Sequence, residues 1–135
     1  MPGTGAFDGR WTYRSFRNDP DIGTPFDSLA FGLGTLELAE PEIGRLTGTL
    51  GGEGWSLALN GHTSYGAPFA VRVQGTGTIG GELWVYDYAG YLVPVWPHGV
   101  DQVPAIVGSL VRTAPHSGGQ AEAGYVASFI AVRTG

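Results

Sequence analysis

"FAVRVQGTGTIGGELWVYDYAGY", residues 69–91, is the stretch that decides the fold. Its first part, 69–79, alternates apolar and polar residues, and its second part, 82–91, is rich in aromatic and β-favouring residues. Alternation with a period of two is typical of β-strands, and the glycine-rich "TIGG" between the parts is typical of a tight turn. The stretch therefore predicts two antiparallel strands that form a hairpin.

Six further stretches carry the same signals: 10–16, 29–38, 45–50, 55–61, 103–113 and 124–133. Helical periodicity is nearly missing, because glycine interrupts almost every candidate window. Eight consecutive strands with mostly short connections favour an all-β fold, an antiparallel up-and-down β-barrel that occupies residues 1–135 as one domain. Closure into a barrel removes the exposed sheet edges. A β-sandwich is the alternative architecture.

Two patterns within the predicted strands bear on how the barrel wall is built. Gly75 and Gly77 lie two positions apart and so share a face, and the pair at 32 and 34 does the same. Barrel walls use such glycines for sharp coiling or for the close approach of another group. The alternation in 29–38 also places Leu29, Phe31 and Leu33 together on one face.

Composition excludes several classes of chemistry. The chain has a net charge of −5, and all seven of its basic residues are arginines. The negative charge argues against a nucleic-acid partner, because phosphates require basic residues. Without lysine there is no Schiff-base chemistry, and without cysteine there are no thiol nucleophiles or thiolate metal sites. No signal peptide or membrane span is evident. We therefore expect a cytoplasmic protein with no cofactor and no membrane association.

The start of the first predicted strand and the end of the last carry a family resemblance. Gly9, Arg10 and Trp11 open the first strand, and Arg133 ends the last. This pattern resembles that of the calycins, which include the lipocalins, fatty-acid-binding proteins and avidins. They share a Gly-x-Trp near the start of strand one, and an arginine or lysine from the end of the barrel packs across that indole. The resemblance implies a small barrel with a ligand cavity, and it identifies no ligand.

The up-and-down order sorts the connections between the two ends of the barrel. One end receives 17–28, 51–54, 80–81 and 114–123, and the other receives 39–44, 62–68 and 92–102. His98 and His116 flank strand 103–113, which spans over 30 Å at about 3.3 Å per residue, so we expect no site common to both. We expect no metal site. The alternative is a site formed by His62, His98 and Asp101, which share an end, because two histidines and a carboxylate can hold a divalent metal.

The aromatic strand 82–91 has two faces that are both largely apolar. If Trp84, Tyr86 and Tyr88 point into the lumen, they line an aromatic pocket whose hydroxyls orient a ligand. If Asp87 points inward instead, desolvation raises its pKa and makes it a candidate general acid or base. A salt bridge from Asp87 to Arg72 on the neighbouring strand is the structural alternative. Two apolar faces also predict a homo-oligomer.

We therefore expect a barrel that binds an apolar or aromatic small molecule in its lumen, behind a mouth gated by 17–28 or 92–102. The expected lining residues are Trp11, Trp55, Trp84, Tyr86 and Tyr88, with Arg72 and Asp87 as polar anchors. One alternative is a cofactor-free isomerase, cyclase or lyase in which Asp87 is the enclosed acid or base. The other is an oligomeric interaction module whose outward aromatic residues contact other proteins.

Overall fold

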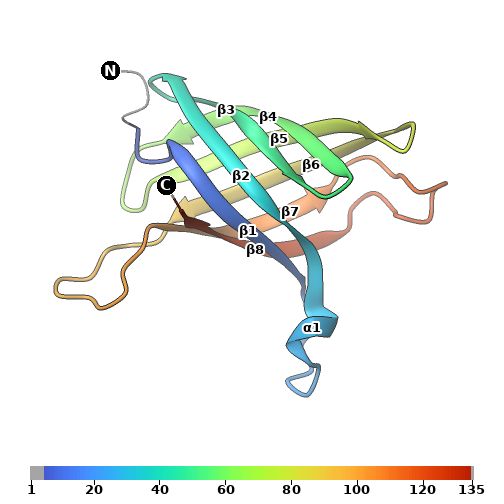
Figure 1. The fold of residues 1–135 in the computed structure, drawn as a ribbon, viewed down its shortest axis with the longest axis horizontal. Coiled ribbons are helices and arrows are strands. Elements are labelled where there is room, and N and C mark those ends of the chain that lie inside the picture. Colours follow the sequence, from blue (N-terminus) through green and yellow to red (C-terminus); the bar gives the residue numbers. More distant parts are fainter. Residues whose placement is uncertain (1–4, 135) are drawn as a thin grey trace.

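Eight antiparallel strands close into a barrel in the computed structural model, which describes residues 5–134 (Figure 1). The elements are β1 (Gly9–Arg17), α1 (Phe26–Leu29), β2 (Ala30–Glu42), β3 (Arg45–Gly52), β4 (Trp55–Ser64), β5 (Ala70–Ile79), β6 (Glu82–Leu92), β7 (Ala105–Arg112) and β8 (Val126–Arg133). Each strand pairs with its neighbours in sequence, and β1 also pairs with β8. The predicted up-and-down barrel is thus confirmed, and the sandwich alternative is wrong.

The predicted strands agree with the observed ones to within a few residues. The largest difference is β2, which continues to Glu42, four residues beyond its predicted end. The short helix α1 was not expected, and it lies within the β1–β2 connection. No helix in the described part of the chain is long and apolar enough to cross a membrane.

A β-bulge changes which residues of β2 face the lumen. The pairing of β1 with β2 shifts register between Ser15 and Phe16, and Phe31 is the residue left without a direct partner. A bulge adds one residue to one strand, so the alternation of faces changes phase at that point. Phe31 borders the lumen, whereas Leu33 is 59% exposed. The expectation that Phe31 and Leu33 share one face is therefore wrong.

An aromatic layer divides the lumen into two halves. The rings of Tyr13, Tyr88 and Phe129 lie 5.7 to 6.3 Å apart, centroid to centroid, across the barrel. Gly75 makes room for this layer, because a Cβ there would lie 3.3 Å from the Tyr88 ring. Below the layer, aliphatic side chains pack so closely that a space of only about 20 Å³ is left, which is roughly room for one water. This half of the barrel is the hydrophobic core.

Trp11 and Arg133 close the packed end of the barrel, where β1 begins and β8 ends (Figure 1). Trp11 is fully buried, and its indole Nε1 donates a hydrogen bond to the Phe7 carbonyl at 3.1 Å. The Arg133 guanidinium carbon lies 4.7 Å from the centre of a Trp11 ring. Its Nη2 donates to the carbonyls of Ala6 and Asp8. The arginine–indole contact implied by the calycin resemblance is therefore present.

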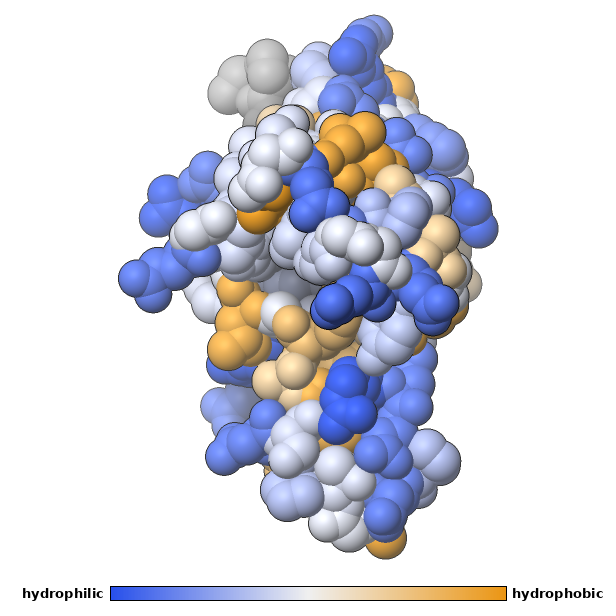
Figure 2. All heavy atoms as spheres, turned by 90° about the vertical axis from the view of Figure 1, so that its right-hand side faces the viewer, coloured by the Kyte–Doolittle hydropathy of each residue, from blue (hydrophilic) through white to orange (hydrophobic). Residues whose placement is uncertain are grey.

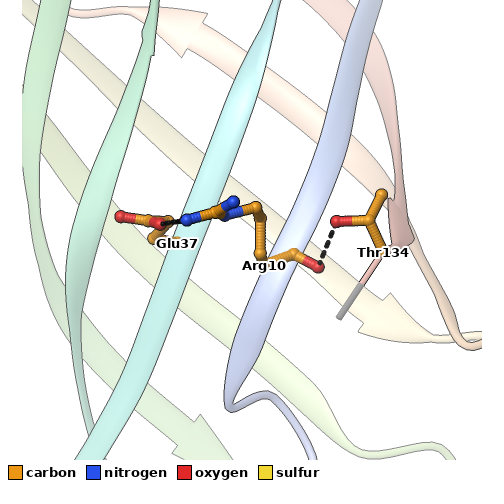
Figure 3. Close-up of polar contacts among 3 residues, drawn as sticks. All are labelled: Arg10, Glu37 and Thr134. Atoms are coloured by element: carbon orange, nitrogen blue, oxygen red, sulfur yellow. Dashed lines mark hydrogen bonds and ion pairs between the residues drawn. The ribbon is translucent and has the colours of Figure 1, made fainter.

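The seam between β1 and β8 is held on the outside of the barrel as well. The Arg10 carbonyl accepts hydrogen bonds from the Thr134 amide at 2.8 Å and hydroxyl at 3.3 Å (Figure 3). The Arg10 side chain reaches across the outer face to β2, where it pairs with Glu37 at 2.9 Å. Both side chains of this ion pair are more than half exposed. Solvent screening therefore leaves the pair at most about 1 kcal/mol of stabilisation.

We expect Arg133→Ala to lower the free energy of unfolding by about 3 kcal/mol, because it removes two charge-assisted hydrogen bonds and a cation–π contact with the buried Trp11 ring. Arg10→Ala is the matched control on the exposed surface and should cost less than about 1 kcal/mol. Urea denaturation followed by tryptophan fluorescence measures both values. Equal losses for the two variants would contradict this account of the closed end.

Candidate functional site

A cavity of about 420 Å³ occupies the half of the lumen above the aromatic layer. Its lining residues come from six of the eight strands and two connections: Tyr13, Ser15, Phe31, Gly32, Gly54, Trp55, Leu57, Ile79, Trp84, Tyr86, Tyr88, Leu110, Arg112 and His116. It opens at the end that holds the β1–β2, β3–β4, β5–β6 and β7–β8 connections, hereafter the mouth. Figure 2 faces this end and shows a recess between hydrophilic and hydrophobic side chains.

Four of the predicted lining residues do border the cavity: Trp55, Trp84, Tyr86 and Tyr88. They lie inward because β4 and β6 alternate in phase with the core, as the buried residues of both strands show. Trp11 is an inward residue too, but it lies at the packed end and does not reach the cavity. The expectation that Trp11 lines the pocket is therefore wrong.

The two predicted polar anchors lie outside the lumen. Arg72 is exposed on β5, and Asp87 alternates outward between Tyr86 and Tyr88 on β6. Asp87 accepts a hydrogen bond from Gln74 at 2.9 Å on the outer surface, and it forms no salt bridge to Arg72. Neither residue lines the cavity, so Asp87 is not the enclosed acid that the enzyme alternative requires.

Leu83 is also exposed on this outer face, and the homo-oligomer stays a prediction.

His116 forms the upper wall of the cavity together with Trp84. The two rings are stacked face to face, with centroids 3.7 Å apart and an angle of 8° between their planes. His116 reaches this place because its connection folds back on itself through a backbone bridge to Ala121. The imidazole is only 5% exposed. The sequence placed His116 at this end of the barrel but assigned it no role.

A chain of hydrogen bonds links Arg112, Tyr86, His116 and Ser117. The Arg112 Nε donates to the Tyr86 hydroxyl at 2.9 Å, and the same hydroxyl lies 2.9 Å from His116 Nε2. His116 Nδ1 lies 2.9 Å from the Ser117 hydroxyl. Because guanidinium nitrogens only donate, the Tyr86 proton is free to point at His116. All contacts are satisfied when neutral His116 carries its own proton on Nδ1 and donates it to Ser117.

The charge state of the lumen follows from burial. Desolvation and the nearby Arg112 charge lower the pKa of His116 below 6.5, while Glu82 opposes this shift. Burial also raises the pKa of Tyr13 to about 12 and that of Tyr88 well above its usual value. The imidazole and these phenols are therefore uncharged at neutral pH. Arg112 is the charged residue in the cavity lining.

Arg112 is held by aromatic rings and backbone oxygen. Its guanidinium carbon lies 5.1 to 5.7 Å from the ring centres of Phe31, Tyr86 and Tyr125. Its Nη1 donates to the Glu122 carbonyl at 3.2 Å. Sequence reasoning missed this residue, although a signal was present: Arg112 continues the inward alternation of Leu110 in β7. A basic residue in phase with the core is unusual enough to mark a candidate site.

The histidines of the alternative metal site are not brought together with a third ligand. His62, His98 and Asp101 are all exposed at the packed end. Within residues 5–134, no group of three or more histidine, aspartate or glutamate side chains is placed to hold a metal. His98 lies at the opposite end of β7 from His116, as the sequence predicted.

Of the two predicted gates, only the connection between β1 and β2 lies at the mouth. It includes α1, which extends away from the barrel wall (Figure 1). Ile22 and Phe26 in this connection are almost fully exposed. The segment 92–102 joins β6 to β7 at the packed end and cannot gate the cavity. That part of the prediction is wrong.

Tyr86→Phe should lower the free energy of unfolding by about 2 kcal/mol, because it leaves the Arg112 Nε and the His116 Nε2 without their buried partner. Tyr91→Phe on the same strand is the matched control, since Tyr91 is 43% exposed. We expect the control to stay within about 0.5 kcal/mol of the wild type. Chemical denaturation measures both, and a neutral effect of Tyr86→Phe would rule out the network.

The lowered pKa of His116 predicts a loss of stability in mild acid. Below the unfolded-state pKa of 6.5, the unfolded chain binds a proton at this position more readily than the folded protein does. The melting temperature should therefore fall as the pH decreases from 8 towards 5.5, and His116→Gln should flatten this fall. His62→Gln, at an exposed position, should behave as the wild type does. Calorimetry across this range checks the difference, and parallel curves for both variants would contradict it.

Protein-family models, curated proteins and solved structures were compared with this chain, and none matches it. The features that bear on function are therefore those of the barrel itself. Its informative part is the cavity, where an aromatic wall, an aromatic floor and a buried arginine surround one opening.

Proposed function

We propose that this protein binds a compact small molecule in the upper half of its barrel. The cavity of about 420 Å³ carries the proposal, because it lies within the range of small-molecule sites and has mostly apolar and aromatic walls. A few polar groups converge on it from one side, through Tyr86, Arg112 and His116. This combination is typical of sites in which apolar contact supplies affinity and polar groups fix orientation.

The walls and floor favour a flat ligand. Trp84 and His116 stack face to face with their planes within 8° of parallel, so the pair forms a rigid aromatic part of the cavity wall. Stacked or edge-to-face contacts between aromatic groups contribute about 0.5–1.5 kcal/mol beyond their buried area. The layer of Tyr13 and Tyr88 limits the depth of the site, and the space of about 20 Å³ below it admits no ligand segment. A flat ring system therefore suits the site better than a long flexible chain.

The same features support a place for this barrel among the calycins. Gly9 and Trp11 open β1, and Arg133 packs on the indole as that resemblance implies. The cavity lies at the opposite end of the barrel from this contact. The residues that close the barrel are therefore different from those that would bind a ligand. This arrangement supports both the calycin assignment and the ligand-binding role that we propose.

The experiment is a titration with N-phenyl-1-naphthylamine, a neutral aromatic probe whose fluorescence rises in apolar sites. We expect saturable binding of one probe per chain. The affinity should fall at least tenfold in Trp84→Leu, which removes an aromatic ring from the cavity wall. The matched control is Trp96→Leu, because Trp96 is 74% exposed on the β6–β7 connection at the packed end. Absent binding, or equal weakening in both variants, would contradict the proposed site.

A further inference from the structure

We infer that the ligand is a planar aromatic carboxylate whose anionic group pairs with Arg112. This inference rests on the proposed binding function and names the chemical class of its ligand. Three observations carry it: the burial of the Arg112 charge without an acidic partner among residues 5–134, the aromatic wall of the cavity that it lines, and the closed floor of that cavity.

The charge of Arg112 has no acidic partner in the part of the chain that the structure describes. Arg112 is 7% exposed, and within residues 5–134 no carboxylate oxygen lies within 4 Å of its guanidinium. By contrast, Arg10 and Arg45 each pair with a glutamate although both are exposed. Buried charges in proteins are normally paired, because desolvation of an isolated ion is costly. An anion brought by the ligand completes the pair.

The existing contacts of Arg112 leave room for such a partner. Its Nε and Nη1 donate to the Tyr86 hydroxyl and the Glu122 carbonyl, and its Nη2 has no hydrogen-bonding partner among residues 5–134. The surrounding aromatic rings attract the cation through their π faces but carry no net charge. A carboxylate accepts charge-assisted hydrogen bonds from a guanidinium, and these are about twice as strong as neutral ones.

The ligand scaffold is set by the residues around that charge. Trp84 lines the same cavity as Arg112 and is linked to it through His116 and Tyr86. An aromatic ring bound in this cavity therefore places its acidic substituent in the same lumen as Arg112. An alkyl chain of fatty-acid length needs a deep cavity, and the aromatic layer limits the depth of this one. The site thus favours a carboxylate on a ring system over a carboxylate on a long chain.

Acidic residues surround the mouth, and their repulsion is the weaker effect. Exposed carboxylates lie on its connections and at the first residue of β6: Asp21, Asp27, Glu53, Glu82 and Glu122. Between solvent-exposed charges, physiological salt screens interactions over about 8 Å. Arg112 is buried, so its attraction for a bound anion is screened much less. The acidic residues at the mouth therefore lower the association rate of an anionic ligand more than they lower the stability of its complex with Arg112.

The test compares 2-naphthoate with 2-naphthamide, which has nearly the same shape and no charge. Both are titrated as competitors of N-phenyl-1-naphthylamine, with decanoate as a carboxylate on an alkyl chain. We expect 2-naphthoate to bind at least tenfold more tightly than the amide, and more tightly than decanoate. Arg112→Gln should abolish the preference for the acid over the amide, whereas Arg72→Gln on the outer wall should preserve it.

The outcomes separate this inference from the proposed function. The acid–amide ratio of the wild type is decisive by itself, so the test holds even if Arg112→Gln does not fold. Equal binding of acid and amide would overturn the carboxylate inference while the binding function stands. Displacement of the neutral probe by neither naphthyl compound would overturn it as well. Failure of the neutral probe itself to bind would overturn both.

Discussion

The aromatic layer of Tyr13, Tyr88 and Phe129 is the constraint on which the rest of the molecule depends. It crosses the lumen at mid-height, where Gly75 leaves room for the Tyr88 ring. Below it, the barrel is packed as a protein core and supplies stability. Above it, the same strands enclose a space of about 420 Å³. One layer thus separates the closely packed half of the lumen from the half that holds the cavity.

Polar groups are arranged differently in the two halves. At the packed end, Arg133 lies on Trp11 and its Nη2 donates to two backbone carbonyls, while its buried Nε has no partner among the described residues. At the mouth, Arg112 shares a network with Tyr86 and His116 and keeps a charge that no described acidic group neutralises. The two arginines both lie over aromatic rings, but the half-buried Arg133 lies at the closed end, whereas the buried Arg112 lines the cavity.

The fold could be predicted from the sequence because its signals are local. Alternation within each strand and glycine turns such as 80–81 fix eight strands and their order, and closure follows from the need to cover edges. The phase of β6 could not be predicted, because both of its faces are apolar. As a result, Asp87 was considered for the lumen although it lies outside.

Other features depend on contacts between distant segments. The bulge at Phe31 arises from the pairing of β2 with β1, so alternation within β2 alone could not reveal it. Alternation also does not tell how far along the barrel axis an inward residue lies. It therefore predicts Trp11 in the cavity, although Trp11 lies at the packed end. His116 required the fold of its connection, whereas Arg112 could have been found from its phase in β7.

Nuclear Overhauser effects can locate a bound aromatic molecule in the barrel. With N-phenyl-1-naphthylamine bound, we predict effects between the probe and the ring protons of Trp84 and Tyr86. We predict none to Leu46 or Ile106, which lie below the aromatic layer. Contacts from the probe to those two residues, or to the exposed Trp96 alone, would contradict a binding cavity in the upper half of the barrel.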